Sequence, residues 1–159
     1  MNKTGYAVVA CLAMAVLGVF LLMTGPYDPF ASGGLQAQIA RGRALYALRC
    51  ASCHGKSLEG QPNWQTPLPS GRMPAPPHDA TGHSWHHTDE MLFGITKLGL
   101  KPYVGESYES DMPAFDSILV DEQINAIWAY IKSTWPERER AYQERITRQS
   151  KGASQDTVR

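Results

Sequence analysis

The sequence predicts an all-α protein of three or more helices joined by long loops, with an N-terminal transmembrane helix ahead of them. Helical periodicity recurs at 35–50, 89–98 and 121–132, and an uncharged apolar run fills 6–23. No stretch shows the alternation of apolar and polar residues that is typical of a half-buried strand. The 159 residues therefore divide into four segments: an anchor at 1–25, a linker at 26–34, one helical domain at 35–135 and a charged extension at 136–159.

The apolar run YAVVACLAMAVLGVFLLM has the length of a membrane span. At about 1.5 Å per residue it covers most of a hydrocarbon core about 30 Å thick. A cleaved signal would have a shorter apolar region and an Ala-x-Ala site soon after it, which is not seen here. Lys3 is the only charge before the run and favours an N-terminus inside the cell. We expect a single-pass protein of a bacterial inner membrane with its domain in the periplasm; a soluble periplasmic protein after signal cleavage is the alternative.

The first predicted helix, 35–50, reads LQAQIARGRALYALRC and runs directly into a cysteine. It is made of helix-forming residues. One side carries residues spaced at steps of three and four: Leu35, Ile39, Gly42 and Tyr46. This side is the one we expect to pack on the rest of the domain.

Two further helices have end signals in the sequence. Thr88 is a suitable N-cap for 89–98, Asp89 lies in the first turn where the helix dipole favours negative charge, and Gly99 ends the helix. The last strong helix is predicted to begin at Asp121 as its N-cap and to run through Lys132. Its apolar stripe consists of Ile124, Ile127, Trp128 and Ile131.

Two segments lack apolar periodicity. Residues 55–88 carry six prolines, and a loop of this length within a compact domain indicates a function or a solid body around which it wraps. After Pro136 the chain is dense in charge and poor in apolar residues. For 136–159 we expect a solvated helical extension that ends in a disordered tail.

Composition excludes several classes of protein. The formal net charge is zero, so the strongly basic profile of a nucleic-acid binder is missing and no nucleic-acid partner is expected. The three cysteines, Cys11, Cys50 and Cys53, are too few for a disulfide framework. A structural zinc site would usually draw on a second Cys-x-x-Cys, which does not occur, and His-x3-5-His spacings are found only within the histidine-rich stretch 78–87.

The stretch CASCH at 50–54 carries the chemistry of the chain. A Cys-x-x-Cys in an oxidising compartment can serve thiol exchange, but that use places it at the start of a helix within alternating strands and helices. Cys-x-x-Cys-His is the signature of covalent c-type haem attachment. Cys50 and Cys53 would bond to the porphyrin, and His54 would be the proximal ligand of the iron.

A second axial ligand must then come from further along the chain. Methionine is a usual choice in electron carriers, where it raises the reduction potential. Met91 falls on the apolar face of a predicted helix, and Met73 follows His54 closely. Met112 lies far downstream in an irregular stretch, with Pro113 after it. We favour Met112 as the distal ligand, with Met73, Met91, a loop histidine or an open position as the alternatives.

These features together resemble a single-haem class I cytochrome c domain over residues 35–135. The Gly-x-x-x-aromatic step of Gly42 and Tyr46, four residues before Cys50, is similar to the first helix of that family. The segment Trp128-Ala129-Tyr130-Ile131 is similar to the part of the last helix that crosses the first at the glycine, with Tyr130 the expected contact. The Met-Pro pair at 112–113 matches the distal ligand.

The resemblance implies a cytochrome c-like fold, in which helices and long loops wrap around one covalently attached haem c. It also implies one-electron transfer between respiratory or other redox partners rather than enzymatic catalysis. Alternatives are a haem-based small-ligand sensor, a cytochrome subunit of a membrane oxidoreductase and a copper-handling protein. The segment 60–87 is longer than the family needs, so the proline whose carbonyl orients His54 is Pro74, Pro76 or Pro77.

Two surface features bear on partners. The stretch HDATGHSWHH at 78–87 is rich in imidazoles, which copper and zinc favour. We expect instead that Trp85, His86 or His87 lines the haem edge or bonds a propionate, with a second metal site as the alternative. Four acidic residues bracket Met112 and would favour a redox partner with a basic docking surface: Glu106, Glu109, Asp111 and Asp116.

Overall fold

The computed structural model describes residues 34–156. They belong to one compact unit, Gly33–Arg159. The predicted anchor at 1–25 and residues 26–33 of the predicted linker lie outside the described residues. In the described part, no helix has the length and apolar character needed to cross a membrane.

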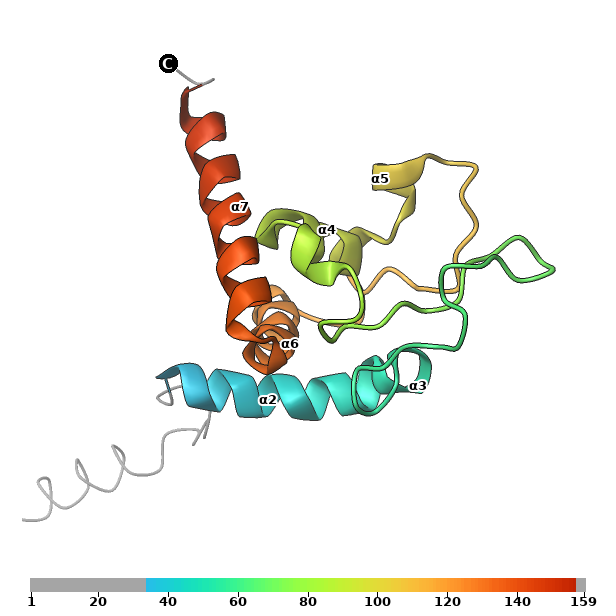
Figure 1. The fold of residues 1–159 in the computed structure, drawn as a ribbon, viewed down its shortest axis with the longest axis horizontal. Coiled ribbons are helices and arrows are strands. Elements are labelled where there is room, and N and C mark those ends of the chain that lie inside the picture. Colours follow the sequence, from blue (N-terminus) through green and yellow to red (C-terminus); the bar gives the residue numbers. More distant parts are fainter. Residues whose placement is uncertain (1–33, 157–159) are drawn as a thin grey trace, which may run out of the picture. The chain divides into compact units, whose positions relative to one another are not determined.

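Seven helical elements and no strands make up residues 34–156, as the all-α prediction requires (Figure 1). Five are α2 (Gly34–Arg49), α4 (Asp89–Leu98), α6 (Asp121–Thr134), α7 (Glu137–Asp156) and the short turn α3 (Ala51–His54). The other two are the 3-10 turn η1 (Ser84–His86) and the single turn α5 (Lys101–Val104). Long irregular segments connect α3 to η1 and α5 to α6.

Of the two N-caps predicted from the sequence, Thr88 is confirmed and Asp121 is wrong. The Thr88 side chain accepts a hydrogen bond from the amide of Met91 at 3.3 Å, which confirms Thr88 as the N-cap of α4. Asp121 is not the N-cap of α6, because it is the first helical residue and Val120 precedes it in extended conformation. Oε1 of Gln123 accepts from the Val120 amide at 3.1 Å, and the carboxylate of Asp121 pairs with Lys97 at 2.7 Å.

The crossing of α2 and α6 depends on the absence of a side chain at Gly42. A Cβ at that position would meet the carbonyl oxygen of Ala126 at 1.8 Å and the Cβ of Tyr130 at 3.0 Å. Glycine therefore lets the two helices approach backbone to backbone. In Figure 1, α6 is seen almost end-on where it crosses α2. Tyr130 contacts this crossing as expected, but the closest group is the backbone of Ala126.

A single apolar cluster joins these helices to the loops. Its buried members come from α2, α4, α6, the two irregular segments and the end of α6: Tyr46, Leu58, Leu92, Phe115, Leu119, Ile124, Ile127, Ile131 and Trp135. The stripe predicted for 121–132 supplies three of them. The cluster is in contact with the start of α3, because Cys50 and Ala51 pack against it.

The C-terminal segment is helical, as expected for 136–159, but part of it is buried rather than solvated, and residues 157–159 lie outside the described residues. Residues 137–156 form one continuous helix, α7, and its residues Gln143 and Thr147 are buried. Nε2 of Gln143 lies 2.7 Å from Oδ1 of Asp89 and 3.2 Å from the carbonyl oxygen of His87. The Asp89 amide donates to Oγ1 of Thr147 at 3.1 Å. The helix is thus docked through polar groups, which a search for apolar periodicity does not detect.

Candidate haem site

The CASCH stretch forms one helical turn at the end of α2. Cys50 occupies the position before α3, and the amide of His54 donates to the Cys50 carbonyl at 2.9 Å. The two cysteines are not joined in a disulfide; Cys50 is half-buried and Cys53 is exposed. Because residues three apart on a helical turn share a face, the two thiols can reach the same group. Burial, with a smaller contribution from Cys53, raises the pKa of the Cys50 thiol to about 11.

His54 is buried and held by one directed hydrogen bond. Its Nδ1 lies 2.8 Å from the carbonyl oxygen of Pro76. A carbonyl only accepts hydrogen bonds, so Nδ1 carries the proton and Nε2 keeps its lone pair. Burial lowers the pKa of His54, although the bond to Pro76 acts in the opposite direction. The imidazole is therefore neutral, in the tautomer that a metal-binding histidine needs. Of the three candidate prolines, Pro76 is the one that orients it.

The proline-rich loop after α3 is held close to the turn that carries His54. The amide of Gly60 donates to the His54 carbonyl at 2.8 Å, and the amide of His78 donates to the Leu58 carbonyl at 2.8 Å. Gly60 has φ +69°, and a Cβ there would meet the backbone nitrogen of Pro77 at 2.4 Å. The hydroxyl of Tyr46 donates to the Gly55 carbonyl at 2.8 Å. These bonds fix Pro76 relative to His54.

His78 is a part of the site that the sequence interpretation did not identify. Its ring stacks on the ring of His54, with the centroids 4.1 Å apart and an interplanar angle of 20°. Its Nδ1 shares a hydrogen bond with Oγ of Ser84 at 2.8 Å, and its carbonyl accepts from Nε1 of Trp135 at 2.7 Å. Burial first, and the neighbouring His54 second, lower the pKa of His78 well below its ordinary value. A neutral ring is thus packed against the predicted ligand.

Met112 lies in the irregular segment between α5 and α6. Its amide donates to Oγ of Ser110 at 3.0 Å, and its half-buried side chain packs against the core cluster. Met73 and Met91 are also half-buried, but among the described residues they are not part of the set packed against that cluster. Met112 is thus the loop methionine that reaches the core from outside any helix.

An ion-pair bridge joins the Met112 segment to the proline-rich loop. The guanidinium of Arg72 lies 2.5 Å from Asp111 and 3.3 Å from Glu109. Two of the four acidic residues expected to face a partner are therefore paired inside the chain. In the part of the chain that the structure describes, Glu106 and Asp116 form no such pair.

The side chains of the histidine-rich stretch 78–87 differ in burial and in partners. Among residues 34–156, no three His, Cys, Asp or Glu side chains are placed to hold a metal ion. His86 is exposed and His87 is half-buried. Nε1 of Trp85 donates to the Gly82 carbonyl at 3.1 Å, and Trp85 and His86 pack with Tyr142 of α7. A role of Trp85, His86 or His87 at the haem edge stays a prediction.

The described donor groups suit a covalently bound haem. Two thiols one turn apart can each form a thioether bond, and the neutral His54 beside them offers Nε2 as an iron ligand. No curated protein and no solved structure gave a significant match to the chain. A family model described as Cytochrome c matches residues 39–135, which is more than half of the sequence. With this match, Cys50, Cys53 and His54 are the attachment motif for haem c, and the chain belongs to the cytochrome c family.

Proposed function

We propose that this c-type cytochrome is a membrane-tethered, single-haem carrier of class I that moves one electron at a time between redox partners. The hydrogen bond from Nδ1 of His54 to the carbonyl of Pro76 carries the proposal. It fixes one neutral imidazole in place as the proximal ligand. Family membership supports an electron carrier in general; the class, the tether and the partners are what we add to it.

Met112 is the distal ligand in this proposal. It comes from a loop rather than a helix, packs against the core, and belongs to a segment anchored by the pairing of Asp111 with Arg72. With His54 and Met112 both engaged, the site has no position left for a substrate or a small ligand. A methionine ligand also raises the reduction potential relative to a second histidine.

The residues around His54 can keep its ring in the same place in both redox states. Bound haem supplies the one-electron couple. Pro76 holds Nδ1 of His54, and the ring of His78 covers one face of the imidazole. Trp135 in turn holds the backbone of His78 from the end of α6. A ligand fixed on several sides moves little when charge changes, which lowers the cost of rearrangement on electron transfer.

A tether follows from the apolar run at 6–23, which we propose as a span of the bacterial inner membrane with the haem domain in the periplasm. Anchoring holds the carrier near neighbouring membrane complexes at high effective concentration.

For docking we propose a partner with a basic surface. Glu106 and Asp116 are the acidic residues near Met112 that Arg72 does not neutralise.

Met112 is tested by substitution in the holoprotein. We expect Met112→Ala to lower the midpoint potential and to make the reduced protein bind carbon monoxide rapidly, because the distal position opens. Met91→Ala is the matched control, a half-buried methionine on α4, and should change neither property. Rapid carbon monoxide binding by the wild type at neutral pH would show that the distal position is open, and the carrier proposal would fail.

The tether is tested by fractionating cells that express the full chain or residues 26–159. We expect the full chain in the membrane fraction and resistant to alkaline extraction. The shortened chain, exported with a cleavable signal, should be soluble and keep the same haem spectrum. Recovery of the full chain in the soluble fraction, with a mass that shows removal of its N-terminus, would overturn the tether.

A further inference from the structure

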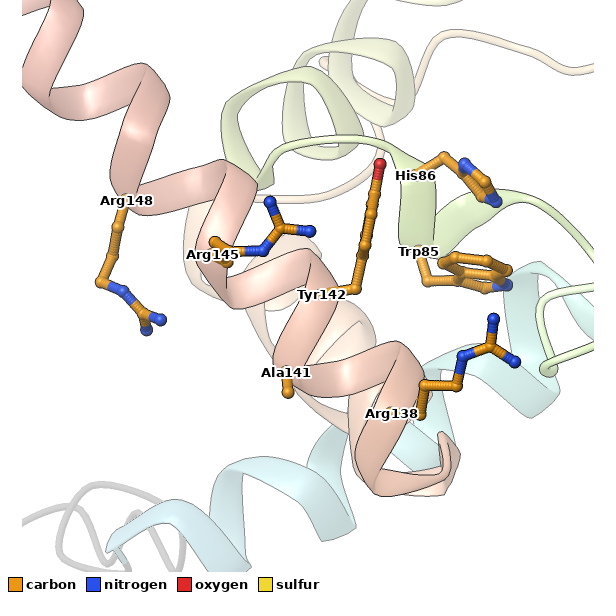
Figure 2. A pocket seen from close by; sticks show the side chains of 7 residues that line it. All are labelled: Trp85, His86, Arg138, Ala141, Tyr142, Arg145 and Arg148. Carbon is orange, nitrogen blue, oxygen red and sulfur yellow. The ribbon is translucent and has the colours of Figure 1, made fainter.

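An open pocket of about 570 Å³ lies between η1 and α7, and none of its lining residues belongs to the haem attachment motif (Figure 2). Seven residues line it: Trp85, His86, Arg138, Ala141, Tyr142, Arg145 and Arg148. Its volume is in the range of small-molecule sites. The pocket exists because α7 is a docked helix rather than a loose extension.

The charge of this pocket has one sign. Three of the lining residues are arginines and none is a carboxylate. Arg148 pairs weakly with Glu144 at 3.7 Å, and the guanidinium of Arg145 lies 4.8 Å from the centroid of the Tyr142 ring. Arg138 forms no ion pair with any described residue. Figure 2 shows the guanidinium groups of Arg138 and Arg145 directed toward the aromatic side chains.

The aromatic part of the pocket is ordered by ring contacts. The rings of Trp85 and His86 have centroids 3.7 Å apart. Tyr142 stands perpendicular to Trp85, with centroids 5.5 Å apart and an interplanar angle of 89°. Because η1 and α7 hold these rings in place, a planar ligand could pack on them without first ordering them.

We propose that this pocket binds a planar aromatic anion, that is, a ring that carries a phosphate or carboxylate group. Guanidinium groups bind both anions through paired hydrogen bonds, and they attract π-systems as well. The ring of the ligand packs against Trp85 and His86, while its anionic group accepts hydrogen bonds from Arg138 and Arg145. A simple inorganic anion would use the arginines and leave the aromatic part of the pocket unused.

The test is calorimetric titration of the full-length holoprotein in detergent. The probes are adenosine monophosphate and 2-naphthoate as aromatic anions, with adenosine, inorganic phosphate and acetate as their separate parts. We expect at least one aromatic anion to bind about 10-fold more tightly than its parts, and the pair of probes distinguishes phosphate from carboxylate. Equal affinity for the aromatic anions and their parts, or no binding of either aromatic anion, would overturn the proposal.

Substitutions locate the binding in the pocket. Arg138→Gln and Arg145→Gln should each weaken the better probe by about 10-fold or more. Arg140→Gln makes the same change of charge on the same helix but outside the lining, and should leave affinity within about 2-fold. If Arg140→Gln weakens binding as much as Arg138→Gln, the probe responds to the general charge of α7 and the site is refuted. Circular dichroism and the haem spectrum check that each variant is folded.

Discussion

Two helix packings hold this domain together, and they use opposite chemistry. The crossing of α2 with α6 is apolar and very close, with the Ala126 backbone occupying the space left by Gly42. The docking of α7 beside α4 is polar in its buried part, through the side chains Gln143 and Thr147, while Tyr142 adds ring contacts with η1. The first packing is sensitive to added side-chain volume, whereas the second is sensitive to the loss of hydrogen-bonding partners. The two should therefore fail under different substitutions and at different pH.

The largest effect is expected at the apolar crossing. Gly42→Ala places a methyl group 1.8 Å from the Ala126 carbonyl oxygen, so the helices must separate. We expect a loss of about 3 kcal/mol of unfolding free energy from overpacking, measured by guanidinium denaturation of the holoprotein. Gly152→Ala is the matched control, because a Cβ there meets nothing within 4 Å. Equal stability of the two variants would mean that α2 and α6 are not in close contact at Gly42.

A smaller loss is expected at the polar docking. Gln143→Ala removes the donor to Asp89 and to the His87 carbonyl, so that Asp89 keeps only Lys132 as its side-chain donor and the His87 carbonyl loses its bond to Gln143. The expected cost is about 1–2 kcal/mol, confined to α7. Hydrogen exchange should show faster exchange of α7 amides, with α2 unchanged. Gln149→Ala, at an exposed glutamine of the same helix, should behave as wild type. Loss of protection in α2 as well would show that the two packings are not independent.

The polar docking should also depend on pH through Asp89. Although burial acts to raise it, the hydrogen bonds from Lys132 and Gln143 lower the pKa of Asp89 below its ordinary value. A carboxyl with a depressed pKa stabilises the folded state above its unfolded pKa, and this stability is lost as the pH falls through the folded pKa. We expect α7 protection to decline below about pH 4. In Asp89→Asn the protection should already be reduced at neutral pH and depend less on pH. If the Asp89→Asn variant lost α7 protection at low pH as the wild type does, a group other than Asp89 would be responsible for the decline.

The difference between the two packings also explains what the sequence could predict. The stripe Ile124, Ile127 and Ile131, together with Gly42, indicated α6 and its crossing because apolar periodicity reports burial of apolar residues. The same rule missed the docking of α7, whose buried residues are Gln143 and Thr147. Whether a polar side chain is solvated or buried depends on partners distant in sequence, here Asp89 and His87.

The haem site also contains residues that the sequence predicts and residues that only the fold reveals. Cys50, Cys53 and His54 were found by their spacing, because covalent attachment requires one short motif. Which of three prolines orients His54 was set by the path of the loop, and the structure selects Pro76. His78 was identified only as part of a histidine-rich stretch, although it stacks on His54 while His86 is exposed. Residues of the same type within one short stretch can differ in burial, and composition alone does not show which of them is buried.

The smallest expected effect compares two ion pairs within the same docking region. Lys132 and Asp89 lie 2.7 Å apart and are partly buried, whereas Arg148 and Glu144 lie 3.7 Å apart on the surface of α7. An exposed pair of this kind contributes about 0.3–0.5 kcal/mol at most. A double-mutant cycle with Glu144→Gln and Arg148→Gln should therefore give a coupling energy near this limit that falls further with added salt. The cycle with Asp89→Asn and Lys132→Gln should give a larger coupling that is less sensitive to salt, because Asp89 is also held by Gln143. Equal couplings in the two cycles would mean that Asp89 is solvated, and that α7 is held by contacts other than the polar network.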